Sequence, residues 1–160
     1  MSDYTGLLIG VLLLLGNAFF VGAEFAIISA RRSQIEPLVA TSKRAHWTLK
    51  GMENVSLMLA GAQLGITVCS LGLGAVAEPA LAHIIEPLFE SWGLPTEYVH
   101  VVGFVVALTF VVYLHIVIGE MVPKNAAFSM PDQAVLLLAP PLVWVSRVFR
   151  HIIAALNAIA

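Results

Sequence analysis

The sequence contains few charged residues and only one cysteine. Charged residues make up 11% of the 160 positions, whereas hydrophobic residues make up 59%; ordinary soluble domains carry about a quarter charged residues. This composition excludes a typical soluble domain and predicts an integral membrane protein. Because Cys69 is the only cysteine, no disulfide can form within the chain, and we interpret Cys69 as a small core residue inside a membrane span.

The motifs of common catalytic sites are missing as well. The sequence has no glycine-rich phosphate loop, no catalytic triad and no metal-hydrolase spacing. Glu24 and Glu120 could serve formally as an acid and a base, but no nucleophile or substrate pocket is evident beside them. We therefore do not expect an enzyme.

Long hydrophobic runs are what the sequence does contain. Three segments are apolar and long enough to cross a hydrocarbon core of about 30 Å, and they cover about residues 6–29, 57–77 and 99–119. The apolar stretch at the C-terminal end is interrupted by adjacent prolines and contains Arg147 and Arg150, so we predict one or two interfacial or re-entrant helices over about 132–160. The sequence thus predicts an all-α membrane protein with three transmembrane helices in a single domain, residues 1–160.

Positive charge is absent from one of the two connections between these spans. The segment from Glu78 to Tyr98 holds four glutamates and no lysine or arginine, whereas the connection between the first two spans holds five basic residues. Because basic loops remain in the cytosol, we predict that the N-terminus lies outside and the C-terminus inside. Within the acidic outer loop, helical spacing between Pro79 and Phe89 predicts a short, separate interfacial helix.

Glu120 stands at the end of the third hydrophobic run. A carboxylate at the edge of a span is costly unless it has a partner, so we expect a functional role with a cation as that partner. Pro123 cannot donate a hydrogen bond to the carbonyl four residues back, which is that of Gly119. A carboxylate and a freed carbonyl would then lie side by side, which suits a hard cation such as Mg²⁺. The alternative is that Glu120 has reached the lipid headgroups and Pro123 simply ends the span.

The other two spans place oxygen-bearing side chains at a similar depth. The first span runs inward with Glu24 near its inner end, and the second span carries Gln63 and Thr67 in its first half. The polar groups are therefore expected to converge in the inner part of the membrane. Two glutamates held close together repel unless one is protonated or a cation lies between them, so either a proton-linked or a metal-linked site fits.

Two further polar residues lie near this site. His115 is about 140° around an ideal helix from Glu120, so we do not expect the two to share a ligand. Asn17 lies two turns before Glu24 and either extends the polar path or makes a packing hydrogen bond. Small residues at four-residue spacing predict closely packed helix surfaces, namely Ala18, Gly22 and Ala26 in the first span and Gly61 and Gly65 in the second.

Three groups of motifs follow one another along the chain. They are Asn17-Ala-Phe-Phe-Val-Gly-Ala-Glu-Phe-Ala26 with Arg31-Arg-Ser-Gln-Ile-Glu36, then Ala62-Gln-Leu-Gly-Ile-Thr67, then His115-Ile-Val-Ile-Gly-Glu-Met-Val-Pro-Lys124. In this order they resemble the transmembrane domain of the CorC/cyclin M (CNNM) family of magnesium transporters, also known as hemolysin-like membrane proteins. The Gly-Glu-x-x-Pro-Lys element is the most specific part, and the similarity covers nearly the whole chain.

This resemblance implies a function and an assembly. It implies a homodimer in the cell membrane that exports Mg²⁺, with Na⁺ as the coupling ion. It implies Glu120 as the acidic ligand of the transported ion and matches Glu24 to the acidic residue of the first-span motif. A cytosolic pair of CBS modules is expected to follow this domain in the natural protein. The remaining expected partners are the lipid bilayer and metal cations, and no nucleic acid is expected.

The chain departs from the family pattern around the expected ion site. The family's best-known members have serines around the first-span glycine and asparagines in the second span, where this chain has apolar residues, namely Val21, Ala23, Ala62 and Ile66. We expect Gln63, Thr67 and Ser70 to compensate. The expected metal ligands are therefore Glu120, Gly119, Glu24, Gln63, Thr67 and Ser70. Fewer side-chain oxygens mean that Mg²⁺ keeps more water or takes more backbone carbonyls.

Two other functions fit the same residues. The spans could act only as an anchor and sensor for cytosolic regulatory domains, in which case ions would change the conformation without crossing. Alternatively, the two carboxylates and the less polar first span would suit export of an organic polycation such as a diamine. Competition between such an amine and a divalent metal would separate this function from magnesium export.

Overall fold

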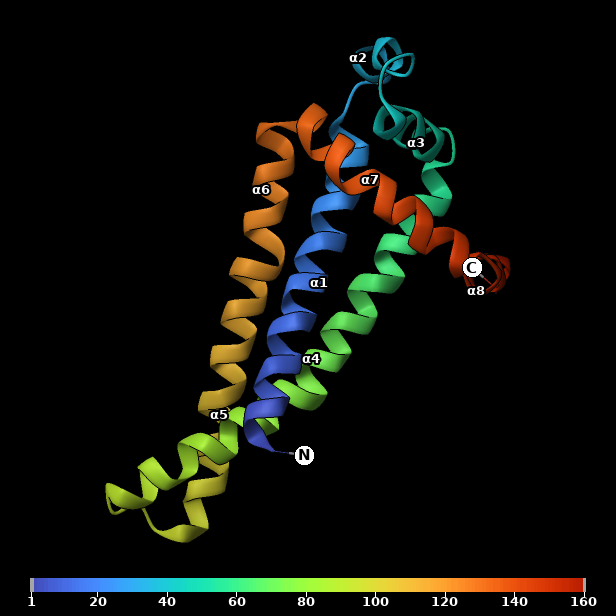
Figure 1. Cartoon of the computed structure of the whole chain (residues 1–160). Coiled ribbons are helices and arrows are strands. Elements are labelled where there is room, and N and C mark those ends of the chain that lie inside the picture. Colours follow the sequence, from blue (N-terminus) through green and yellow to red (C-terminus); the bar gives the residue numbers. More distant parts are fainter. Residues whose placement is uncertain (1, 160) are drawn as a thin grey trace.

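The computed structural model describes residues 2–159, and throughout this range the chain forms helices and no strands (Figure 1). Their bounds are α1 Asp3–Ser29, α2 Arg32–Ile35, the 3₁₀ turn η1 Glu36–Leu38, α3 Lys43–Met52, α4 Val55–Ser91, α5 Thr96–Leu114, the π-helical segment η2 His115–Met121, α6 Val122–Ser129, α7 Pro131–Val148 and α8 Arg150–Ile159. The predicted all-α class is confirmed.

Three of the helical segments are long and apolar enough to cross a membrane, as predicted. They are α1, α4 and the continuous run from Thr96 to Ser129 that joins α5, η2 and α6. The second and third extend well beyond the predicted spans at 57–77 and 99–119. In Figure 1 the three lie side by side over much of their length, with α1 contacting both of the others.

The expectation of a separate helix between Pro79 and Phe89 is wrong. Both Pro79 and Pro87 lie inside α4, which continues without interruption from Val55 to Ser91. A proline inside a helix removes one backbone hydrogen bond and bends the axis, but the helix can continue beyond it. Figure 1 shows the yellow-green half of α4 turning away from the direction of the first half. The acidic segment therefore continues α4, the helix that contains the second span.

The segment after the third span forms two helices, α7 and α8, which begin one residue before the predicted range of 132–160. Helix α7 crosses α1 and α4 near the end where the short helices α2 and α3 lie (Figure 1). Its buried face, which includes Val135, Ala139 and Leu142, joins the main hydrophobic core with residues of α1, α3, α4 and α6. In addition, the Thr48 hydroxyl of α3 donates to the Val135 carbonyl of α7 at 3.4 Å. Helix α7 therefore closes one end of the three-helix group.

Small residues bring α1 and α4 into close contact with each other and with α7, as their spacing predicted for helix packing. A Cβ atom placed on Gly65 of α4 would lie 2.5 Å from the Phe20 ring of α1, and one placed on Gly22 would lie 3.2 Å from Leu138 of α7. A Cβ atom placed on Gly61 would lie 2.2 Å from the Ser146 hydroxyl of α7. These positions have no room for a larger residue unless a neighbour moves. They fix the separation of the helices around the polar residues described below.

Candidate functional site: a polar cluster at a π-helical segment

The third spanning helix contains a wider turn just before Pro123. Over His115–Met121 the backbone is π-helical, and the Val122 amide donates to the Val117 carbonyl five residues back. Pro123 has no amide hydrogen, and its ring would clash with the Gly119 carbonyl in a regular helix. The wider turn relieves that clash, and such turns occur often at functional sites.

The Gly119 carbonyl, which lies within this wider turn, accepts a hydrogen bond from α1. The Asn17 side-chain amide donates to the Gly119 oxygen at 3.0 Å, and the Asn17 side chain is fully buried, with 0% of its surface exposed. The backbone at Gly119 is also packed tightly, because a Cβ atom there would lie 3.0 Å from the Asn17 nitrogen. Asn17 therefore makes a packing hydrogen bond, one of the two roles predicted for it.

A directed chain of hydrogen bonds joins the three spans at this level. The Ser70 hydroxyl of α4 donates to the Asn17 side-chain oxygen at 3.2 Å. The same hydroxyl lies 3.1 Å from Nε2 of His115. Since a hydroxyl has one proton, which Asn17 receives, the His115 Nε2 must be the donor in the second bond. Each member of the chain orients the next, so the group is held in one arrangement.

Glu120 joins this group through His115. Its carboxylate oxygen Oε1 lies 3.8 Å from His115 Nε2, and 47% of the Glu120 side chain is exposed, against 19% for His115. The expectation that these two residues point apart is wrong, because it assumed an ideal α-helix. In a π-helical turn, residues five apart come into line. We call Asn17, Ser70, His115, Gly119 and Glu120 the Asn17 cluster.

Among the described residues, the other predicted ligands form no hydrogen bond with the Asn17 cluster. The Gln63 side chain lies close to the Glu24 carboxyl group. Glu24 follows Asn17 by seven residues along α1, which corresponds to about 10 Å. Thr67 is exposed, and its hydroxyl donates to the Gln63 carbonyl at 2.9 Å. The predicted ligands thus fall into two groups, Glu120, Gly119 and Ser70 in the cluster and Glu24, Gln63 and Thr67 outside it.

Sequence reasoning found part of the Asn17 cluster and missed the rest. It identified Glu120 and Gly119 from the Pro123 break, and it named Ser70 as an expected ligand. It left His115 out, although a proline four residues after a glycine signalled a disturbed helix at that point. Within residues 2–159 no three His, Cys, Asp or Glu side chains lie close enough together to hold a metal ion. Any ion held at the cluster must therefore rely on neutral oxygens and water in addition to Glu120.

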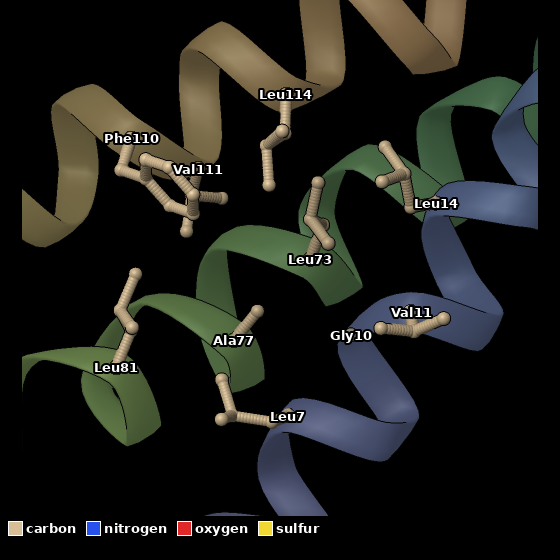
Figure 2. Close-up of a pocket in the computed structure, with 10 residues that line it drawn as sticks. All are labelled: Leu7, Gly10, Val11, Leu14, Leu73, Ala77, Leu81, Phe110, Val111 and Leu114. Carbon is tan, nitrogen blue, oxygen red and sulfur yellow. The ribbon is translucent and has the colours of Figure 1, made fainter. Parts of the chain in front are cut away.

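The spanning helices leave an apolar cavity on the side of the Asn17 cluster that faces the N-terminus of α1. A cavity of about 240 Å³ lies there between α1, α4 and α5 (Figure 2). The ten residues that line it are all apolar, and they include Leu14, Leu73, Val111 and Leu114. Leu14 is less than one turn from Asn17 along α1. The polar groups of the cluster therefore face a hydrocarbon barrier in that direction.

We expect Asn17→Leu to destabilise the protein by about 1–3 kcal/mol. The substitution leaves the Gly119 carbonyl and the Ser70 hydroxyl without their partner in a buried site, and unsatisfied buried polar groups cost about this much. Denaturation of the detergent-solubilised protein by sodium dodecyl sulfate, followed by circular dichroism, measures the change. Thr109→Val is the matched control, because the exposed Thr109 hydroxyl only donates to its own helix. Equal stability of the two variants would contradict the role assigned to Asn17.

Comparison with known proteins identifies the kind of domain. Residues 8–160 match the model of the cyclin M transmembrane N-terminal domain. The uncharacterized protein Rv1841c of Mycobacterium tuberculosis (strain H37Rv) is 42% identical over 158 residues, which cover 98% of this chain and 45% of that protein. The UPF0053 proteins YhdT and YugS of Bacillus subtilis are 44% and 39% identical, covering 89% and 96% of this chain but 31% and 36% of theirs.

The chain spans less than half the length of these curated relatives. The similarity nevertheless includes all three spanning helices and the segment that follows them. The chain is thus a membrane protein domain, and it belongs to the CNNM family.

Proposed function

We propose that this domain exports Mg²⁺ across the cell membrane as a homodimer, in exchange for Na⁺, with the ion bound at the Asn17 cluster. The observation that carries the proposal is the half-exposed Glu120 carboxylate within a membrane-spanning helix, 3.8 Å from His115, which in turn lies 3.1 Å from the Ser70 hydroxyl. Ionisable groups inside a span are functional by default. The oxygens are hard ligands of the kind that Mg²⁺ prefers.

The arrangement of the polar groups supports a route toward one side of the membrane. The Glu24–Gln63 pair lies about two helical turns from Asn17 along α1, toward the end where α7 crosses. The apolar cavity lies on the opposite side of the cluster. In this conformation an ion would reach Glu120 from the Glu24 side, which the charge distribution predicts to be cytosolic. Release to the other side would then require the helices around the cavity to move apart.

A sensor that binds ions without transporting them is the second candidate. One observation favours it: the Gly119 carbonyl already accepts a hydrogen bond from Asn17, so it is engaged within the protein. An ion that displaced Asn17 would shift α1 relative to the third span. Such a movement could be passed to attached domains without any ion crossing. An organic diamine, which two carboxylates would suit, is the third candidate.

Ion flux in proteoliposomes tests the proposal. Liposomes that contain the protein, Na⁺ and a Mg²⁺-sensitive dye are placed in a Mg²⁺ solution, and choline replaces Na⁺ in a parallel sample. We expect dye signals above those of protein-free liposomes, and a faster signal with Na⁺ than with choline. Mg²⁺ binding without flux would contradict transport and favour the sensor. Flux of a linear diamine that Mg²⁺ inhibits, without Mg²⁺ flux, would favour the polycation exporter.

A further inference from the structure

A basic pocket lies away from the Asn17 cluster, where α3, α4, α7 and α8 meet. It has a volume of about 370 Å³. Three basic side chains and one amide form its polar part: Lys50, Asn54, Arg147 and Arg150. Leu57, Met58 and Val143 form its apolar part, and none of the lining residues is acidic. The basic pocket thus combines concentrated positive charge with an apolar surface.

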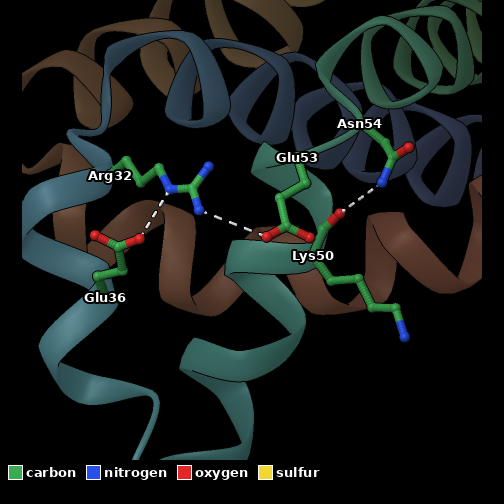
Figure 3. Close-up of polar contacts among 5 residues, drawn as sticks. All are labelled: Arg32, Glu36, Lys50, Glu53 and Asn54. Carbon is green, nitrogen blue, oxygen red and sulfur yellow. Dashed lines mark hydrogen bonds and ion pairs between the residues drawn. The ribbon is translucent and has the colours of Figure 1, made fainter.

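The three positive charges of the basic pocket are not neutralised by neighbouring carboxylates. Glu53 lies close by along the chain, but its carboxylate pairs with Arg32 at 3.6 Å, and Arg32 also binds Glu36 at 3.1 Å (Figure 3). In Figure 3 the Lys50 ammonium group extends away from Glu53. Among residues 2–159, neither Lys50 nor the two pocket arginines forms an ion pair.

An aromatic ring holds two of these cations near each other. The Arg147 guanidinium lies 4.6 Å from the centre of the Trp47 ring, and the Lys50 ammonium lies 5.5 Å from it. A cation–π contact orients a cation but leaves its charge in place. Trp47 and the neighbouring Trp144 are both exposed, and tryptophans of this kind are enriched at the level of the lipid headgroups. These contacts indicate that the basic pocket lies at the membrane surface.

We propose that the basic pocket binds an anionic phospholipid of the leaflet on its own side of the membrane. Lys50, Arg147 and Arg150 would contact the phosphate, for which arginine provides paired donors. The glycerol backbone and the first acyl carbons would lie against Leu57 and its apolar neighbours. Basic pockets between helices on the cytosolic side recognise lipid headgroups by this combination. A free phosphate would leave the apolar part of the pocket unused.

Lipid binding to the purified protein in detergent tests this proposal. Native mass spectrometry measures the retention of phosphatidylglycerol, with phosphatidylcholine and water-soluble glycerol phosphate as comparison ligands. Lys50→Gln, Arg147→Gln and Arg150→Gln are combined in one variant. The matched control combines Arg31→Gln, Lys43→Gln and Arg44→Gln, which remove the same charge from the same end of the molecule without touching the pocket. Circular dichroism and gel filtration establish that both variants are folded.

We expect the protein to prefer phosphatidylglycerol over phosphatidylcholine, and the pocket variant to lose at least about tenfold in affinity, since each cation near a membrane surface contributes about fivefold. The control variant should stay close to the parent protein at physiological salt, where distant charges are screened. An equal loss in both variants would overturn the proposal in favour of diffuse surface charge. Glycerol phosphate binding as tightly as the lipid would overturn it in favour of a site for a free phosphate ester. If the pocket variant does not fold, Lys50→Gln alone should still lower retention, and unchanged retention would overturn the proposal.

Discussion

Replacing Glu120 with glutamine is expected to reduce Mg²⁺ flux in proteoliposomes to the level of protein-free liposomes. The glutamine has nearly the same shape, but it removes the negative charge beside the proposed ion. A unit charge pair about 4 Å apart contributes about 4 kcal/mol at an effective dielectric constant of 20. That corresponds to a roughly thousandfold loss of affinity for a singly charged ion, and the loss is larger for a divalent one.

The control for this experiment is Glu97→Gln. Glu97 is an exposed residue in the first turn of α5, and its replacement changes the net charge by the same amount at the other end of the same span. We expect it to leave flux unchanged. Both variants should elute from gel filtration like the parent protein. Retained flux in a folded Glu120→Gln protein would remove Glu120 from the transport site. Loss of flux in both variants would instead attribute the effect to surface charge.

A second large effect is expected from a single methyl group at Gly61. A Cβ atom there would lie 2.2 Å from the Ser146 hydroxyl and 3.1 Å from the Ser146 Cβ atom. Rotation of the serine relieves only the first contact, so α7 must also move away from α4. Overpacking of this kind costs about 1–3 kcal/mol. We therefore expect Gly61→Ala to lower the free energy of unfolding by that amount, as measured by detergent denaturation.

Two further variants test whether the contact between α4 and α7 causes the loss of stability in Gly61→Ala. Gly74 lies in the same helix, and a Cβ atom there would meet nothing within 4 Å. Gly74→Ala should therefore raise stability by up to about 1 kcal/mol, because alanine favours the helix more than glycine does. Adding Ser146→Gly to Gly61→Ala should restore most of the lost stability. If the double variant were as unstable as Gly61→Ala, the contact between Gly61 and Ser146 would not be the cause of the instability.

The hydropathy of the sequence was sufficient to predict the three spans, but the shape of two of them was not predictable in this way. Prolines at 79 and 87 suggested that the second helix ends, because proline breaks helices in water. In α4 both are accommodated within one continuous helix. Whether a proline bends or ends a helix depends on the packing around it, which a single sequence does not record.

The candidate site was predictable where local chemistry decided it and unpredictable where helix geometry did. The loss of a backbone donor at Pro123 follows directly from the covalent structure of proline, so a disturbed helix around Gly119 could be predicted. The partner of the Gly119 carbonyl, Asn17, comes from a different span, and only the packing of α1 selects it. The contact between His115 and Glu120 required knowledge of the π-helical turn. An ideal helix, applied to residues 115–120, gives the opposite result.

The π-helical segment also fixes how the two halves of the third span are rotated relative to each other. A turn with one additional residue advances every later side chain by about 100° compared with an uninterrupted α-helix. This rotation sets which face of α6 meets α1, where Phe128 packs edge-on against Phe25 with ring centres 5.3 Å apart. Deleting one residue between 115 and 121 would remove the extra residue, and the face of α6 that now contacts α1 would point in another direction. For this helix a single-residue deletion is therefore equivalent to a register slip in a sheet, since it changes the neighbours of every residue that follows.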